Sequence, residues 1–483
     1  MLAPRFGSPG RATSRFMPIN KRVGRAYIVL LILALTSLLL TSHLFLLQRP
    51  PSPLPSSTPT FNSDYPFETT SAFDPVSFPS PWNTTAAFLC ASFPSHLTDR
   101  IQPVLKMGHG ENPSQIAAQL STVSSCFPPS DLLIFSDLDQ PLPPHGLHHA
   151  IDILAHLPPA YHRNNPDLGP YRALQALLKN TNDSDVDIDP THDPTAKTGW
   201  KTDKYKFLLL IERAWATKPG RDWYVFYETD TYLVWDNVFR LLSMLDPAEP
   251  VYMGSPSPGR QGTFFANGGP GFALSRGAME RLLSRRGGRG DCCGDSVLGW
   301  MLWEAGVGVS GLFPMFSPWA ADQTPYTERT WCQPVVSMHK TRPGDVERLW
   351  RWEFGARELG RPLLFADLYE FYQVKGQETR EDWDNAIWDR LAQGHDVPGD
   401  SIQACVEACE ADETCLQYLW RGEKAKQCVL MPYVSHGRQR ADETGAGGFR
   451  FFSGWMVERI DQWKRRNTCH EVAWVSPSTE RIY

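Results

Sequence analysis

The chain has 483 residues, a formal net charge of −6 and 21% charged residues. Past residue 25 it contains no run of basic residues, which argues against a nucleic-acid-binding protein. The length is sufficient for one large folded domain with an appendage, or for two domains.

Residues 26–47 (AYIVLLILALTSLLLTSHLFLL) contain no Lys, Arg, Asp or Glu. At ~1.5 Å per residue a helix of this length crosses a ~30 Å hydrocarbon core. The following QRPPSPLP is a poor cleavage site, so we expect an uncleaved anchor and not a signal peptide. Residues 1–25 have basic but no acidic residues, which predicts a cytoplasmic tail and a type II topology.

All ten cysteines follow this segment. An even number on the lumenal side predicts disulfides, and the rival reading, metal-binding cysteine pairs, lacks a CxxC motif. Asn83 and Asn182 begin glycosylation sequons on the same side.

Residues 48–85 are rich in Pro, Ser and Thr, which is typical of an extended stem. Strands and helices then alternate within a predicted domain at 86–395. We expect strands at 131–136 and 223–227, and helices at 171–180, 203–217 and 236–245. This alternation predicts an α/β fold with parallel strands.

The second predicted strand is followed at once by Glu228, Thr229 and Asp230. In open α/β sheets ligands bind at the carboxyl ends of strands. Two carboxylates there would suit Mg²⁺ or Mn²⁺. Two other readings remain open at this point: Asp137 and Asp139 also follow a strand, and Asp230 could simply cap the next helix.

Six blocks in the same order resemble glycosyltransferase family 31, which includes the fringe proteins and the core 1 β-1,3-galactosyltransferases. The blocks are LLIFSD (132–137), WKTDKYKFLLLIERAW (200–215), ETDTYLVWDNV (228–238), MGSPSPGRQGTFFANGGPGFALSRGAM (253–279), CCGDSVLGWML (292–302) and WCQPVVSMHK (331–340). The resemblance implies a GT-A type nucleotide-sugar-binding fold. The chain departs from the family where Glu228 and Thr229 replace the first aspartates of the metal block.

The resemblance also implies residue roles. Asp230, Glu228 and His339 would hold Mn²⁺, and Asp295 would be the general base that accepts the proton of the acceptor hydroxyl. Asp295 could instead be an N-cap of the helix that follows, and a helix N-terminus would lower its pKa. The implied nucleotide-sugar contacts are Asp137, Lys201, Lys204, Thr229, Gly268 and Gly269.

Residues 396–483 contain Cys405, Cys409, Cys415 and Cys428 with the spacing C-x3-C-x5-C-x12-C. The pattern resembles a PAN/apple-like module, in which a helix is stapled to a small sheet. The resemblance implies the pairs Cys405–Cys428 and Cys409–Cys415, which spacing alone does not determine.

The expected function is an inverting transfer of a hexose or N-acetylhexosamine from a UDP-sugar to a glycan or glycoprotein hydroxyl, with the family's β-1,3 linkage. A type II topology is common in Golgi enzymes, so we expect a Golgi or ER membrane protein with a lumenal catalytic domain. The oligomeric state stays open. One alternative is a catalytically inactive protein of the same fold that binds carbohydrate or protein. The other is a glycoside hydrolase, which needs two catalytic carboxylates and no nucleotide.

Overall fold

The computed structural model describes residues 90–92, 99–142, 147–181, 200–284, 294–355, 361–372, 378–386, 394–422, 426–440 and 451–482. The predicted tail, anchor and stem, both sequons, Cys292 and Cys293 lie outside these residues. In the described part of the chain, no helix combines the length and apolar character needed to cross a membrane.

An eight-stranded mixed sheet forms the centre of the fold, in the order β11-β7-β10-β5-β1-β2-β4-β3. Its strands are β1 (Ile101–Lys106), β2 (Leu133–Ser136), β3 (Gln140–Leu142), β4 (His148–Asp152), β5 (Trp223–Glu228), β7 (Tyr252–Gly254), β10 (Phe272–Ser275) and β11 (Val309–Gly311). Strands β5, β1, β2 and β4 are parallel, whereas β10 runs antiparallel to both β5 and β7. The predicted α/β class is confirmed, and the prediction of parallel strands holds for only part of the sheet.

Strand β5 shows why the sheet is covered on both faces. Its residues are all apolar or aromatic up to Tyr227, and successive side chains point to opposite faces. Trp223, Val225 and Tyr227 pack into one hydrophobic core, and Tyr224 and Phe226 pack into the other. A strand with two apolar faces is stable only between two layers of helices.

The helices that fill these layers follow from the same division of the core. The first core takes apolar residues from α4 (Pro113–Ser121), α9 (Trp235–Ser243), α12 (Pro343–Gly355) and α13 (Phe365–Tyr372). The second takes them from α6 (Gly169–Thr181), α8 (Lys206–Thr217), α10 (Arg276–Leu283) and α11 (Gly294–Glu304). The predicted helices at 171–180 and 236–245 correspond to α6 and α9. The predicted helix at 203–217 is divided into α7 (Trp200–Asp203) and α8. The short helix α5 (Pro159–Asn164) precedes α6.

A second, three-stranded sheet lies beside the end of β5. It consists of β6 (Tyr232–Leu233), β12 (Phe316–Ser317) and β13 (Ser337–Met338). Strand β13 pairs antiparallel with β6, with Met338 opposite Tyr232. The residues just before β6 and just after β13 are therefore neighbours. A further hairpin is formed by β8 (Pro256–Pro258) and β9 (Phe264–Ala266).

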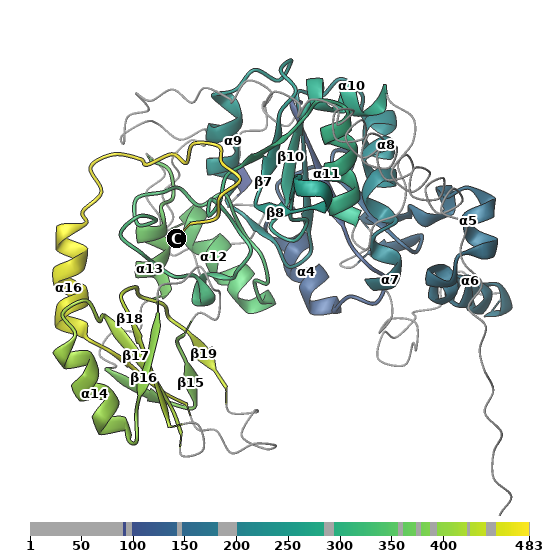
Figure 1. Cartoon of the computed structure of the whole chain (residues 1–483). Coiled ribbons are helices and arrows are strands. Elements are labelled where there is room, and N and C mark those ends of the chain that lie inside the picture. The colour runs from purple at the N-terminus through teal and green to yellow at the C-terminus, as the bar shows by residue number, and fades with distance from the viewer. Residues whose placement is uncertain are drawn as a thin grey trace, which may run out of the picture. The chain divides into compact units, whose positions relative to one another are not determined.

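The C-terminal module is a five-stranded sheet in the order β14-β20-β17-β18-β16. Helix α14 (Ile402–Ala411) packs on this sheet, beside β16, β17 and β18 (Figure 1). Its strands are β14 (Thr379–Glu381), β16 (His395–Pro398), β17 (Gln417–Arg421), β18 (Gln427–Met431) and β20 (Phe451–Trp455). Because β14 and β16 begin before residue 396, the sheet extends across the predicted boundary. Strands β15 (Trp383–Asp384) and β19 (Arg438–Gln439) form a separate pair.

Four disulfides are present in the described residues, as the cysteine pattern predicts. Two of them, Cys405–Cys428 and Cys409–Cys415, are the pairs implied for the C-terminal module. The others are Cys90–Cys126 and Cys332–Cys469. Through the last pair and α16 (Val457–Arg466), which packs into the first core, the end of the chain is attached to the larger domain.

Candidate functional site

Glu228 and Asp230 lie where β5 ends and the chain turns into β6. The turn is fixed by hydrogen bonds: the Thr231 amide donates to the Glu228 carbonyl (3.1 Å), and the Thr231 hydroxyl donates to the Gly269 carbonyl (2.6 Å). His339 follows β13 directly, so the β6–β13 pairing places it beside the turn. The Thr341 amide also donates to the Asp230 carbonyl (3.0 Å).

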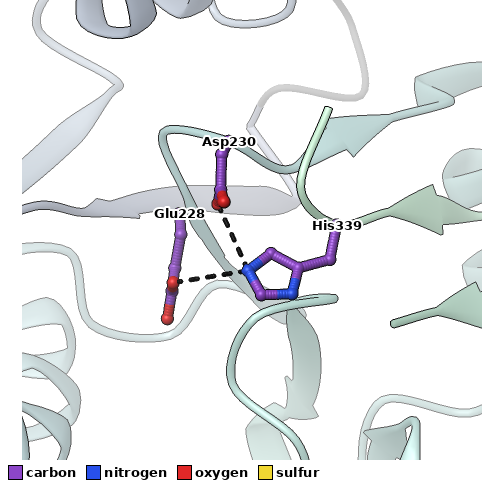
Figure 2. A group of neighbouring side chains, drawn as sticks. All are labelled: Glu228, Asp230 and His339. Atoms are coloured by element: carbon purple, nitrogen blue, oxygen red, sulfur yellow. Dashed lines mark ion pairs between the residues drawn. The ribbon is translucent and has the colours of Figure 1, made fainter. Parts of the chain in front are cut away.

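The three side chains point toward one another (Figure 2). His339 Nε2 lies 3.3 Å from Asp230 Oδ1 and 4.0 Å from Glu228 Oε2. One ligand atom from each residue lies within 4.8 Å of the others, and this is the one such group among the described residues. Two carboxylates and an imidazole are suitable ligands for a divalent ion such as Mn²⁺.

A glycine-rich loop at residues 268–271, called the glycine loop below, packs directly against this group. A Cβ atom at Gly269 would overlap the His339 ring, and one at Gly268 would lie 2.7 Å from Phe207. Gly271 has φ +79° and a hypothetical Cβ 2.7 Å from the Phe226 carbonyl. Only glycine satisfies these positions without moving a neighbour.

Asp295 lies near the start of α11, where burial raises its pKa although two backbone amides stabilise its charge. The Gly268 amide donates to Asp295 Oδ2 (3.0 Å), and the Ser296 amide donates to Oδ1 (2.9 Å). The sequence-based expectation of a lowered pKa is therefore wrong, because burial outweighs the helix terminus and these hydrogen bonds. Asp295 is also linked to the glycine loop through Gly268.

Asp137 is buried at the end of β2, and other groups of the protein bind its carboxylate. It accepts a hydrogen bond from the His109 amide (2.8 Å), and Lys206 Nζ lies 3.7 Å from it. Burial raises the pKa of Asp137, but Lys206 and His109 outweigh this and hold it well below its usual range. The rival Asp139 is exposed and pairs with His149.

The lysines beside the site differ from those expected. Lys204 pairs with Asp167 (2.7 Å), and Lys201 is exposed. Instead, Lys106 Nζ lies 3.1 Å from Glu228 and 2.7 Å from Asp203. Although burial lowers the pKa of Lys106, the two carboxylates outweigh it, and the pKa lies far above its ordinary value.

Sequence reasoning missed Lys106, Asp203, Lys206 and Glu111. Lys106 ends β1, a strand that the sequence analysis did not predict, and a lysine closing the largely apolar segment IQPVL was the available signal. Glu111 accepts a hydrogen bond from the Thr229 hydroxyl and another from the Gly108 amide (2.7 Å). Thr229 therefore faces Glu111. Burial raises the pKa of Glu111 to about 7.

Lys106, Glu228 and Asp137 share one edge of the sheet. Lys106 on β1 lies opposite Glu228 on β5 and opposite Phe135 on β2. Asp137 comes two residues after Phe135. The carboxyl ends of three parallel strands thus carry alternating charges, at the edge where α/β sheets bind ligands.

No protein-family model matches the chain.

Proposed function

We propose that the chain is an inverting, metal-dependent glycosyltransferase of GT-A type that uses a UDP-sugar donor. The observation that carries the proposal is the convergence of Glu228, Asp230 and His339 at the carboxyl end of β5. A UDP leaving group gains negative charge as its bond to the sugar breaks, and a carboxylate-bound cation beside it meets that requirement.

The chemistry of the three residues fits Mn²⁺. Carboxylates suit hard divalent ions, and an imidazole shifts the preference toward Mn²⁺ over Mg²⁺. The space for the imidazole depends on a glycine at 269. When bound, the ion would neutralise the charge of the diphosphate.

Asp295 is the proposed general base. Its two oxygens are held by the Gly268 and Ser296 amides, and burial raises its pKa, which makes it a better proton acceptor. In the transfer, the acceptor oxygen bonds to the anomeric carbon while the bond from that carbon to the UDP oxygen breaks. The proton of the acceptor hydroxyl passes to Asp295.

The remaining expectations belong to the same proposal. The acceptor is a glycan or glycoprotein hydroxyl, and the linkage is β-1,3. Residues 26–47 anchor the protein in a Golgi or ER membrane as a type II protein, and the C-terminal module has a PAN/apple-like fold.

UDP release tests the proposal. Full-length protein and its Asp230→Ala variant are incubated with a panel of UDP-sugars and with mixed glycan and peptide acceptors, with Mn²⁺ or with chelator. The expected result is release that requires Mn²⁺ and disappears in the variant. Glycan cleavage without any nucleotide would instead identify a hydrolase.

One observation favours a non-catalytic binding protein as the second candidate. Lys106 places an ammonium group 3.1 Å from Glu228, where it competes with a cation for that carboxylate. If folded protein binds UDP or glycans but releases no UDP from any donor, this second candidate is correct.

A further inference from the structure

A cavity of about 240 Å³ lies where α12 and α13 meet the C-terminal module. Its wall takes residues from α13, from the β14–β15 segment, from the segment after β18 and from the start of α16. The volume is smaller than the roughly 300–1,000 Å³ of sites for drug-sized ligands, so it suits one small ring. None of the residues of the candidate metal site lines it.

Aromatic rings form much of this wall. Tyr369 and His436 are stacked, with ring centroids 4.7 Å apart, and Tyr372 lies 5.9 Å from His436. Trp383 and Trp455 line the cavity from the side of the module. Flat aromatic faces of this kind pack against the apolar C–H face of a sugar ring while leaving its hydroxyls free for polar partners.

Two buried polar atoms in the wall lack partners in the described part of the chain. Arg380 lies over Trp383 (4.4 Å) and Trp455 (5.6 Å), yet its Nε makes no hydrogen bond. His436 Nε2 also makes none, and burial lowers the pKa of His436 to about 3, so the ring is neutral. A buried polar atom without a partner costs free energy that a ligand hydroxyl would recover.

The charges in the wall are balanced. Arg348 lies 3.3 Å from Asp345, and Arg342 pairs with both Asp322 and Asp345. Arg380 is the third arginine of the wall and Asp461 is its third aspartate, so the lining residues carry equal numbers of both charges. An anion would need an excess of positive charge here. Guanidinium and carboxylate groups together instead supply the donors and acceptors that the hydroxyls of a neutral ligand need.

We propose that this cavity binds a neutral hexopyranose unit of a glycan. The ring stacks on the aromatic wall, and its hydroxyls bond to Arg380, His436 and the wall carboxylates. The inference does not depend on the proposed transfer reaction, because the cavity shares no residue with the metal site, which is the one group of metal-ligating side chains found among the described residues.

Saturation-transfer NMR on the full-length protein tests this site directly. The probes are the methyl glycosides of glucose, galactose and mannose, with methyl glucuronide as the charged comparison, all in chelator and without UDP. The variants are Arg380→Gln and His436→Phe, and the second keeps an aromatic ring but removes the unpartnered Nε2. Arg351→Gln is the matched control, because Arg351 lies on the same helix as Arg348 but pairs with Glu347.

The expected result is binding of at least one neutral glycoside. Its affinity should fall about tenfold, or ~1.4 kcal/mol, in Arg380→Gln or His436→Phe. Arg351→Gln and Asp230→Ala should bind like the wild type. The proposal is overturned if no neutral glycoside binds, if only the glucuronide binds, or if binding survives in both cavity variants. Binding lost in Asp230→Ala alone would place the sugar at the metal site and also overturn it.

Discussion

A Cβ atom at Gly269 would lie 2.2 Å from Cε1, 2.4 Å from Nδ1 and 2.6 Å from Nε2 of His339. The two residues are far apart in sequence, and they meet because the glycine loop and the end of β13 both close on the turn after β5. The hydrogen bond from the Ser337 hydroxyl to the Pro270 carbonyl holds these two segments together.

Gly269→Ala should weaken Mn²⁺ binding by about 10- to 100-fold, the range seen when groups that position a metal ligand are changed. The added methyl group pushes the imidazole away from Asp230 and Glu228. Titration calorimetry with Mn²⁺ measures the effect. Gly308→Ala is the control, because a Cβ there meets no atom within 4 Å. Equal Mn²⁺ affinity in both variants would contradict the role assigned to His339.

Lys106→Met should destabilise the metal-free protein by about 2 kcal/mol. It leaves Asp203 and Glu228 without their shared cation, and both carboxylates are only partly solvated. Mn²⁺ should recover part of this loss because it binds Glu228 without competition. Urea unfolding with chelator and with Mn²⁺ measures both effects. If Mn²⁺ stabilises the variant less than the wild type, Lys106 assists the cation and does not compete with it.

Stability should depend on pH through Glu111. Its pKa is about 7 in the folded state, against 4.5 as the ordinary value. The folded state therefore keeps a proton that the unfolded chain has released. Stability falls as the pH rises from about 4.5 to about 7, by an amount on the order of 3 kcal/mol.

Glu111→Gln removes the titrating group and should flatten this part of the pH profile. Urea unfolding at several pH values compares the variant with the wild type. Parallel profiles in this window would show that Glu111 is not the group responsible.

Asp295→Asn should reduce kcat by about 10²- to 10⁴-fold, the usual contribution of a general base. Asparagine keeps an oxygen that can accept the Gly268 amide, so Mn²⁺ and UDP affinity should stay unchanged. Because burial raises the pKa of Asp295, the wild-type rate should fall with decreasing pH earlier than for an ordinary carboxyl group. If UDP affinity is lost together with kcat, Asp295 instead has a structural role as an N-cap of helix α11.

The sequence by itself determined the local elements and the chemistry of single segments. A continuous apolar run identified β5, and helical spacing identified α6 and α9, because these patterns are local properties of the sequence. The position of Glu228 and Asp230 after a buried strand was equally readable. The pairing of Cys405 with Cys428 came from resemblance, since spacing alone allows three connectivities.

Only the tertiary structure decided which distant groups meet. The antiparallel insertion of β10 beside β5 depends on pairing between strands far apart in sequence. The same holds for Lys106, whose contact with Glu228 arises from the β1–β5 register, and for the raised pKa of Asp295, which comes from burial by neighbouring segments. Burial and charge contacts are properties of the packed chain, so no local pattern specifies them.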